Sequence, residues 1–174
     1  TFSNTDVSCT ACHSNGDSLV DLSTQQQEVE TCAKCHSRRQ QIAPGHTAGA
    51  QFLDHYQPAL LDGDVYYPDG QIKPQHEAFV YGSFRQSKMY RHGVRCSDCH
   101  DPHSGKLKEE GNALCTQCHS ATKFDTIAHH EHPPGTEGAQ CVNCHMPATT
   151  YMGVDARRDH HIRVPDPIMS ARLG

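Results

Sequence analysis

The chain has no tryptophan and few large aliphatic residues. Leu, Ile, Val and Phe together make up 27 of its 174 residues, which is below the roughly one-fifth level at which a chain begins to resemble a disordered one. Such a chain buries too little apolar surface to offset the conformational entropy lost on folding. A folded form therefore needs a core that its own side chains do not supply.

Long hydrophobic runs are missing as well. No stretch approaches the roughly 18–20 apolar residues of a membrane-spanning helix, and no charged and then apolar leader precedes the first motif. The formal net charge is −5, so the chain lacks the basic surplus that nucleic-acid binding requires. We expect one domain over residues 1–174, without a membrane span and without a nucleic-acid partner.

No cysteine lies outside a repeated CxxCH pattern. In each of the five copies, two cysteines at i and i+3 are followed directly by a histidine. This is the attachment site of a c-type haem: both thiols form thioethers with the ring, and the histidine ligates the iron. The predicted attachment residues are Cys9, Cys12, Cys32, Cys35, Cys96, Cys99, Cys115, Cys118, Cys141 and Cys144, and the predicted proximal ligands are His13, His36, His100, His119 and His145.

Two other uses of paired cysteines fit the pattern less well than haem. Four-cysteine zinc sites use CxxC units in pairs, and five is an odd number. A framework of five disulfides would place no demand on the residue after each pair. Five haem c groups are therefore the predicted cofactors. They would form most of the core, with mostly irregular polypeptide and short α-helices around them in a single domain.

Ten of the 15 histidines lie outside the motifs, and five irons need five further ligands if every haem is six-coordinate. Methionine could serve, but there are only four, so histidine on both sides of each iron is favoured. His103 stands three residues after His100, at an offset that suits a neighbouring iron. The other candidates are one or two residues of the His129, His130 and His132 cluster, His160 or His161, and His55, which is preferred to His46 because it follows Phe52-Leu53; His76 and His92 are reserves.

Local signals predict a few regular elements. Thr24 and Gln27 form a capping-box pattern before a helix over 25–34. Pro68-Asp69-Gly70 predicts the turn of a short hairpin. A helix is expected over 77–92, with Gly93 at its C-terminal cap, and Asn112 is a candidate N-cap for a short helix over 113–119. The tail, residues 151–174, is expected to be extended.

Several segments outside the haem motifs resemble bacterial multihaem c-type cytochromes. They are Tyr81–Tyr90, Gly93–Ser104 and Cys141–Tyr151 with Arg157-Arg158-Asp159-His160. The sequence is most similar to the family in which such a haem region is joined to tetratricopeptide repeats. The resemblance implies an extracytoplasmic, haem-binding electron-transfer region, in which His103, the His129–His132 cluster and His160 correspond to family histidines. Since that family continues into further motifs and repeats, this chain is either a fragment or a self-contained small cytochrome.

Three functions follow from these features. The favoured one is an electron carrier that serves other redox proteins or extracellular electron acceptors, in the periplasm or at the cell surface. The rival is a multihaem oxidoreductase acting on a small nitrogen or sulfur compound, which would need an iron with an open position. A third hypothesis concerns assembly: a haem edge near Thr1 and the Pro- and Arg-rich tail would meet between copies and form a head-to-tail filament.

Overall fold

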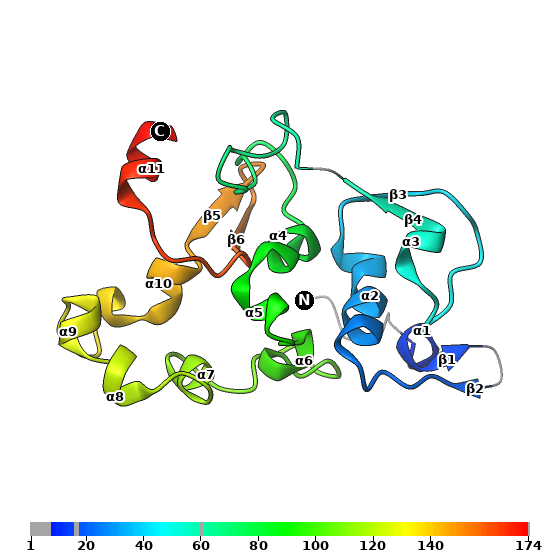
Figure 1. Ribbon diagram of the computed structural model, residues 1–174, viewed down its shortest axis with the longest axis horizontal. Helices are drawn as coiled ribbons and strands as arrows, with labels where there is room; N and C mark the ends of the chain where they lie inside the picture. The colour runs from blue at the N-terminus through cyan, green and yellow to red at the C-terminus, as the bar shows by residue number, and fades with distance from the viewer. Residues whose placement is uncertain (1–7, 16–17, 60, 174) are drawn as a thin grey trace.

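The computed structural model describes residues 8–15, 18–59 and 61–173. Most of the chain is irregular, with short helices and a few two-residue to four-residue strands, which confirms the predicted fold class (Figure 1). The helices are α1 (Thr10–His13), α2 (Gln25–His36), α3 (Phe52–His55), α4 (Val80–Gln86), α5 (Lys88–Arg91), α6 (Cys96–Cys99), α7 (Ala113–Thr116), α8 (Ala121–Phe124), α9 (Ile127–His130), the 3-10 turn η1 (Glu137–Ala139), α10 (Cys141–His145) and α11 (Pro167–Leu173).

The strands pair only as antiparallel hairpins in the part of the chain that the structure describes. They are β1 (Ser14–Asn15) with β2 (Ser18–Leu19), β3 (Arg39–Gln41) with β4 (Tyr56–Pro58), and β5 (Ala148–Tyr151) with β6 (Asp155–Arg158). The predicted hairpin around Pro68-Asp69-Gly70 is confirmed as a tight antiparallel turn, in which Tyr66 and Ile72 form a bridge. No helix among the described residues is long and apolar enough to cross a membrane.

Helix α2 begins where the capping box predicted it. The Thr24 side chain accepts a hydrogen bond from the Gln27 backbone N–H, and the Gln27 side chain accepts one from the Thr24 N–H. These bonds satisfy amide groups that the first turn leaves without partners. The helix continues two residues beyond the predicted end, through the second motif. It therefore ends with that motif's histidine, His36.

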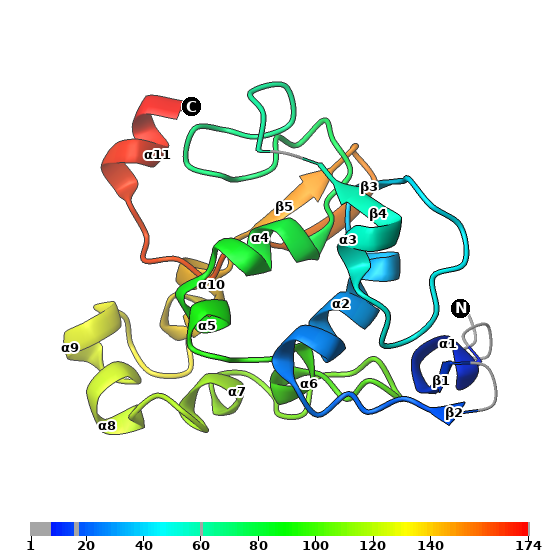
Figure 2. The same cartoon turned by 45° about the vertical axis from the view of Figure 1, so that its right-hand side comes forward.

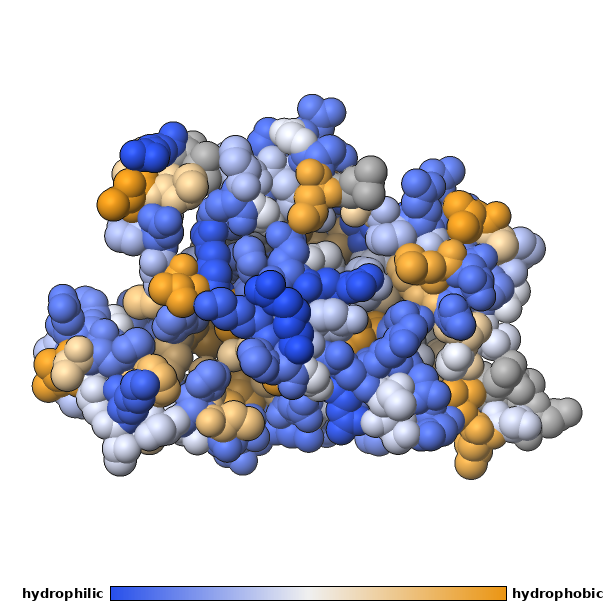
Figure 3. Space-filling model, viewed as in Figure 1, coloured by the Kyte–Doolittle hydropathy of each residue, from blue (hydrophilic) through white to orange (hydrophobic). Residues whose placement is uncertain are grey.

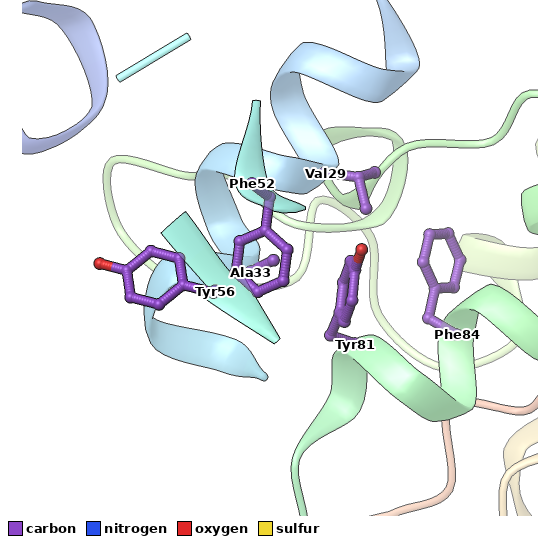
Figure 4. Packing of buried hydrophobic residues seen from close by; sticks show 6 residues of the cluster. All are labelled: Val29, Ala33, Phe52, Tyr56, Tyr81 and Phe84. Atoms are coloured by element: carbon purple, nitrogen blue, oxygen red, sulfur yellow. The ribbon is translucent and has the colours of Figure 1, made fainter. Parts of the chain in front are cut away.

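The hydrophobic core lies between α2, α3 and α4. Its buried members, shown in Figure 4, are Val29, Ala33, Phe52, Tyr56, Tyr81 and Phe84. Phe52 is fully buried, and its ring centroid lies 5.1 Å from that of Tyr56 and 5.3 Å from that of Tyr81. Tyr81 and Phe84, from the segment expected to be helical, are thus core residues. All the buried members of this core come from the first half of the chain.

The helix expected over 77–92 is interrupted. It forms α4 and α5, which are separated by Ser87 in an extended conformation. Ser87 is 1% exposed, and its hydroxyl accepts a hydrogen bond from the Tyr90 N–H, so it caps α5. A serine side chain that bonds the backbone competes with a continuous helix, which explains the break. Gly93 has φ 85°, as expected of a residue that ends a helix.

The second half has almost no core of its own side chains. Between residues 96 and 147, which carry three of the five motifs, the only buried hydrophobic residue is Ala139. The short helices α7, α8 and α9 follow one another along the edge of the molecule in both views (Figures 1 and 2). On the face drawn in Figure 3, a hollow with weakly hydrophobic side chains separates them from the centre.

The tail was predicted to be extended, and this is wrong for its last part. Residues 155–158 form the extended strand β6, but residues 167–173 form helix α11. Pro167 occupies the first helical position, where its missing N–H costs nothing, and the Asp166 carboxylate accepts a hydrogen bond from the Met169 N–H. Pro167 therefore begins a helix in a tail that was expected to be extended.

Candidate haem sites

Each CxxCH motif turns its two cysteines to one side of a helical turn. The backbone N–H of the motif histidine donates to the carbonyl of the first cysteine in three motifs, at 2.9 Å for His13 and His100 and 3.0 Å for His119. In the second and fifth motifs the histidine ends helices α2 and α10. Residues three apart share a helix face, so both thiols can reach one ring while the histidine projects beside them.

Three motif histidines face a histidine from a distant part of the chain. The ring centroids of His13 and His103 lie 6.1 Å apart, with an interplanar angle of 26°. For His100 and His160 the values are 6.3 Å and 20°. For His145 and His129 they are 6.2 Å and 7°. Each pair thus joins one predicted proximal ligand to one predicted distal ligand, with nearly parallel rings.

This separation is what a shared metal ion requires. A metal–imidazole bond is about 2.0–2.1 Å long and the ring centroid lies about 1.15 Å behind the nitrogen, so two imidazoles on opposite sides of one ion have centroids about 6.3–6.5 Å apart. The pair formed by His46 and His55 differs, because its centroids are 5.2 Å apart and its rings are nearly perpendicular, at 86°. The three parallel pairs fit ligation across an iron, and His46 with His55 does not.

Hydrogen bonds hold two of these rings, those of His145 and His160, by Nδ1 and leave Nε2 free to ligate. The Nδ1 of His145 lies 2.8 Å from the Arg163 carbonyl oxygen, and the Nδ1 of His160 lies 2.9 Å from that of Arg158. The Nδ1 of His103 lies 3.8 Å from the Asp101 carboxylate. A partner on the second nitrogen orients the ring and raises its basicity as a ligand.

Burial also favours the neutral form of His100 and His160, one of the three parallel pairs. Loss of solvent lowers the pKa of His100, and the neighbouring His36 lowers it further. Burial lowers the pKa of His160 as well, although the hydrogen bond to the Arg158 carbonyl opposes this effect. A metal ligand must be the neutral imidazole, so the environment of both rings suits ligation.

Other predicted ligands have different surroundings. Among the described residues, no histidine ring faces His36 or His119 in the manner of the three pairs. The Nδ1 of His55 lies 3.0 Å from the Pro44 carbonyl oxygen, beside His46, whose two ring nitrogens are buried without hydrogen-bond partners. His130 turns its Nε2 toward Asp125, at 4.0 Å. His55 and His130 remain predicted ligands to which the structure gives no facing motif histidine.

Neighbouring motifs are joined in the order of the sequence. The Glu28 carboxylate, on α2, accepts hydrogen bonds from the Ser97 N–H at 2.7 Å and the Ser97 hydroxyl at 2.8 Å, on α6. The Gln117 side chain, beside α7, donates to the Asp98 carbonyl of α6 at 3.4 Å. Asn112, just before α7, accepts from the Cys141 N–H of α10 at 2.9 Å.

The cysteine thiols of successive motifs also lie near one another. The thiols of Cys32 and Cys96 are in hydrogen-bonding contact, which raises the pKa of Cys32 and lowers that of Cys96. Burial and the nearby Cys141 raise the pKa of Cys115 to about 11. Burial raises the pKa of Cys12 too, with a further contribution from Cys32. Attachment sites of successive motifs therefore lie side by side, as closely packed haem groups require.

Two of these linking residues were missed or misassigned from the sequence. Asn112 was expected to cap a helix over 113–119, but its backbone is helical, it makes no capping bond, and α7 ends at Thr116. Its amide instead connects Asp125, the Ala139 carbonyl and the Cys141 N–H. Glu28 was not singled out, since a carboxylate on a helix is ordinarily a solvated group and nothing in the local pattern marks its partner.

The residues present fit c-type haem. Paired thiols stand on helical turns, parallel histidines are spaced for a shared iron, and the region with three motifs has almost no apolar core without the rings. By contrast, no group of three or more His, Cys, Asp or Glu gathers in metal-binding geometry among the described residues, as a zinc site built from protein ligands would need.

A comparison with known proteins agrees with haem attachment at the CxxCH motifs. Residues 3–41 and 89–124 match the family model described as "Doubled CXXCH motif", over somewhat less than half of the chain. No curated protein and no solved structure matches the chain. The resemblance to the repeat-containing cytochromes remains an expectation. The two matched segments carry four of the five CxxCH motifs, so over these segments the chain is similar to multihaem c-type cytochromes.

Proposed function

We propose that the protein transfers electrons through five covalently attached haem c groups, each ligated by histidine on both sides. The haems would supply the one-electron couple of iron, and the chain supplies attachment, spacing and ligand orientation. The observation that carries this proposal is the set of three parallel histidine pairs at 6.1–6.3 Å, each with one motif histidine. We assign His103 to the iron of His13, His160 to that of His100, and His129 to that of His145.

The links between motifs support a defined order. Glu28 with Ser97, Gln117 with Asp98, and Asn112 with Cys141 join the second, third, fourth and fifth motifs in turn. His103, on the loop after the third motif, holds the first motif through His13. Cys12 of the first motif lies near Cys32 of the second, so the proposed path follows the sequence from the first motif to the fifth. The third motif, which touches the ligand sets of two irons, is its centre.

The decisive experiment is spectroscopy of the purified holoprotein. We expect about five haems per chain by pyridine haemochrome assay, low-spin ferric signals for all of them, and no carbon monoxide binding after reduction. A stoichiometric high-spin signal that binds carbon monoxide would contradict full bis-histidine ligation. It would favour the oxidoreductase, for which His36 and His119 mark the irons to examine, because no described histidine ring faces either.

A head-to-tail filament is the proposed assembly. Strand β2 and helix α11 lie at opposite ends of the molecule in both views (Figures 1 and 2). Leu19 on β2 is 88% exposed, and Val164, just before α11, and Ile168, on α11, are exposed as well. Contact between such ends in successive copies does not close on itself and gives a filament. Light scattering over a wide concentration range and electron microscopy test this. A particle of constant monomer mass would contradict it.

Location and partners follow from the attachment chemistry. We propose that the protein works outside the cytoplasm, where c-type haem is attached, and exchanges electrons with other redox proteins or extracellular acceptors. The net charge of −5, before the haem propionates add to it, favours partners with a basic face. Reduction of the protein by a basic redox partner should therefore slow as ionic strength rises, and a rate independent of salt would contradict this preference.

A further inference from the structure

A buried charge cluster stands beside two of the proposed ligand pairs. Arg163 forms an ion pair with Asp69, and its Nε lies 3.9 Å from the Asp159 carboxylate. The three side chains are 19%, 10% and 7% exposed, respectively. The Asp159 Oδ2 atom accepts no hydrogen bond, so the nearby Arg163 guanidinium is the main group that offsets its buried negative charge. A buried charge without its partner is costly, and the cluster therefore holds its three members in place.

The cluster is anchored on both sides. Asp69 lies in the hairpin turn, where the Gln71 N–H and side chain donate to its carboxylate at 3.1 and 2.7 Å. A side chain at Gly70, which has φ 83°, would meet Gln86 of α4 at 2.3 Å, so the turn lies tightly against that helix. Asp159 accepts from the His161 N–H, and its own N–H donates to the Pro147 carbonyl. Arg163 thus lies between two carboxylates that each accept further hydrogen bonds.

The backbone of the same segment holds the ligands. The Arg158 carbonyl is bonded to His160, and the Arg163 carbonyl is bonded to His145. Between them Ile162 has φ 48°, which a β-branched residue adopts only when its surroundings impose it. One short, strained segment therefore orients a ligand of the third motif's iron and a ligand of the fifth motif's iron.

We infer that the Asp69–Arg163–Asp159 cluster positions His145 by clamping the segment whose Arg163 carbonyl accepts from its Nδ1. The inference rests on the proposed function, because it assumes that His145 ligates a haem iron. Arginine is required because its planar fork reaches both carboxylates, whereas a lysine ammonium is a single point of charge. If the clamp loosens, the bond to Nδ1 weakens, His145 becomes a less basic ligand, and the ferric state loses stabilisation.

The test compares Arg163→Lys with Arg157→Lys in the holoprotein. Both substitutions keep the charge, but Arg157 is 59% exposed and pairs only with Asp155 at the surface. Arg163→Lys should change one low-spin ferric signal in the electron paramagnetic resonance spectrum and shift one midpoint potential upward. Arg157→Lys should leave every signal and potential unchanged. The affected signal should be the one that His129→Gly removes, since that variant takes away the proposed partner of His145.

The outcomes separate this inference from the proposed function. If Arg163→Lys lowers thermal stability but alters no signal and no potential, the cluster is only a structural staple and the inference fails. A uniform change of all signals would overturn it as well. If Arg163→Lys does not fold, Asp69→Asn gives the same test, because it removes one anchor of the clamp. If His129→Gly removes no low-spin signal, the ligand assignment itself is wrong.

Discussion

The substitution His160→Ala tests the central ligand pair most directly. His160 lies at the middle of the proposed path, with its ring 6.3 Å from that of His100 and its Nδ1 held by the Arg158 carbonyl. Alanine removes the ring together with its bond to the Arg158 carbonyl. The iron of His100 would then keep one protein ligand and gain an open position.

The size of the effect follows from the count of motifs. One iron of five loses its sixth ligand, so about one fifth of the haem should become high-spin, and the reduced variant should bind about one carbon monoxide per chain. The wild type should bind none. The assay is a carbon monoxide titration followed in the Soret band, with the high-spin ferric signal measured on the same sample.

His161→Ala is the matched control, because sequence alone could not choose between the two residues. The Nδ1 of His161 is buried without a hydrogen-bond partner, and its ring forms none of the three parallel pairs. His161→Ala should leave the spectrum of the His100 iron unchanged. If His160→Ala binds no carbon monoxide and keeps all haems low-spin, the reasoning from ring separation is refuted.

Three further predictions concern stability. Glu28→Ala should lower the free energy of unfolding by about 2–3 kcal/mol, because a carboxylate that is 12% exposed loses both bonds to Ser97; the melting temperature followed by circular dichroism should fall by about 4–12 °C. Burial alone would raise the pKa of Asp69. The hydrogen bonds from Arg163 and Gln71 outweigh this effect, so the pKa lies below its usual value. The stabilisation is therefore present above about pH 4 and lost as pH falls through the depressed pKa, so denaturant titrations should show the cost of Asp69→Asn shrinking in acid. Replacing Cys96 and Cys99 by alanine should remove more than one redox centre, because that haem is a central part of the core; native thermal stability with four undisturbed haems would contradict this.

The sequence predicted correctly those elements that depend on hydrogen bonds and turn preferences of neighbouring residues. The capping box at Thr24 placed the start of α2, and Pro68-Asp69-Gly70 placed a hairpin turn, because in both cases the deciding groups lie within four residues of one another. Ser87 and Asn112 were read incorrectly for the opposite reason. Ser87 is buried in the tertiary structure, and Asn112 bonds to residues from 125 to 141. Neither environment is visible in the neighbouring sequence.

The same division applies to the site. The proposed attachment cysteines and proximal histidines carry a sequence signal because the chemistry of haem attachment places them within five consecutive residues. The proposed distal ligands come from elsewhere: His103 follows the third motif but faces the histidine of the first. Pairing of this kind depends on how α1 and the loop after α6 approach each other. The supporting carbonyls of Arg158 and Arg163 carry no side-chain signal at all.

The histidine cluster after α8 shows how the structure resolves a choice that composition leaves open. His129 and His130 are neighbours on α9, and successive residues of a helix project about 100° apart. Only one of them can therefore face a given ring. His129 lies parallel to His145, whereas His130 turns to Asp125 and its Nδ1 accepts from the His132 N–H at 3.2 Å. Under the proposed ligation, a surplus of histidine supplies both the distal ligands and the groups that order the loops around them. The direction of a short helix then decides which residue takes which role.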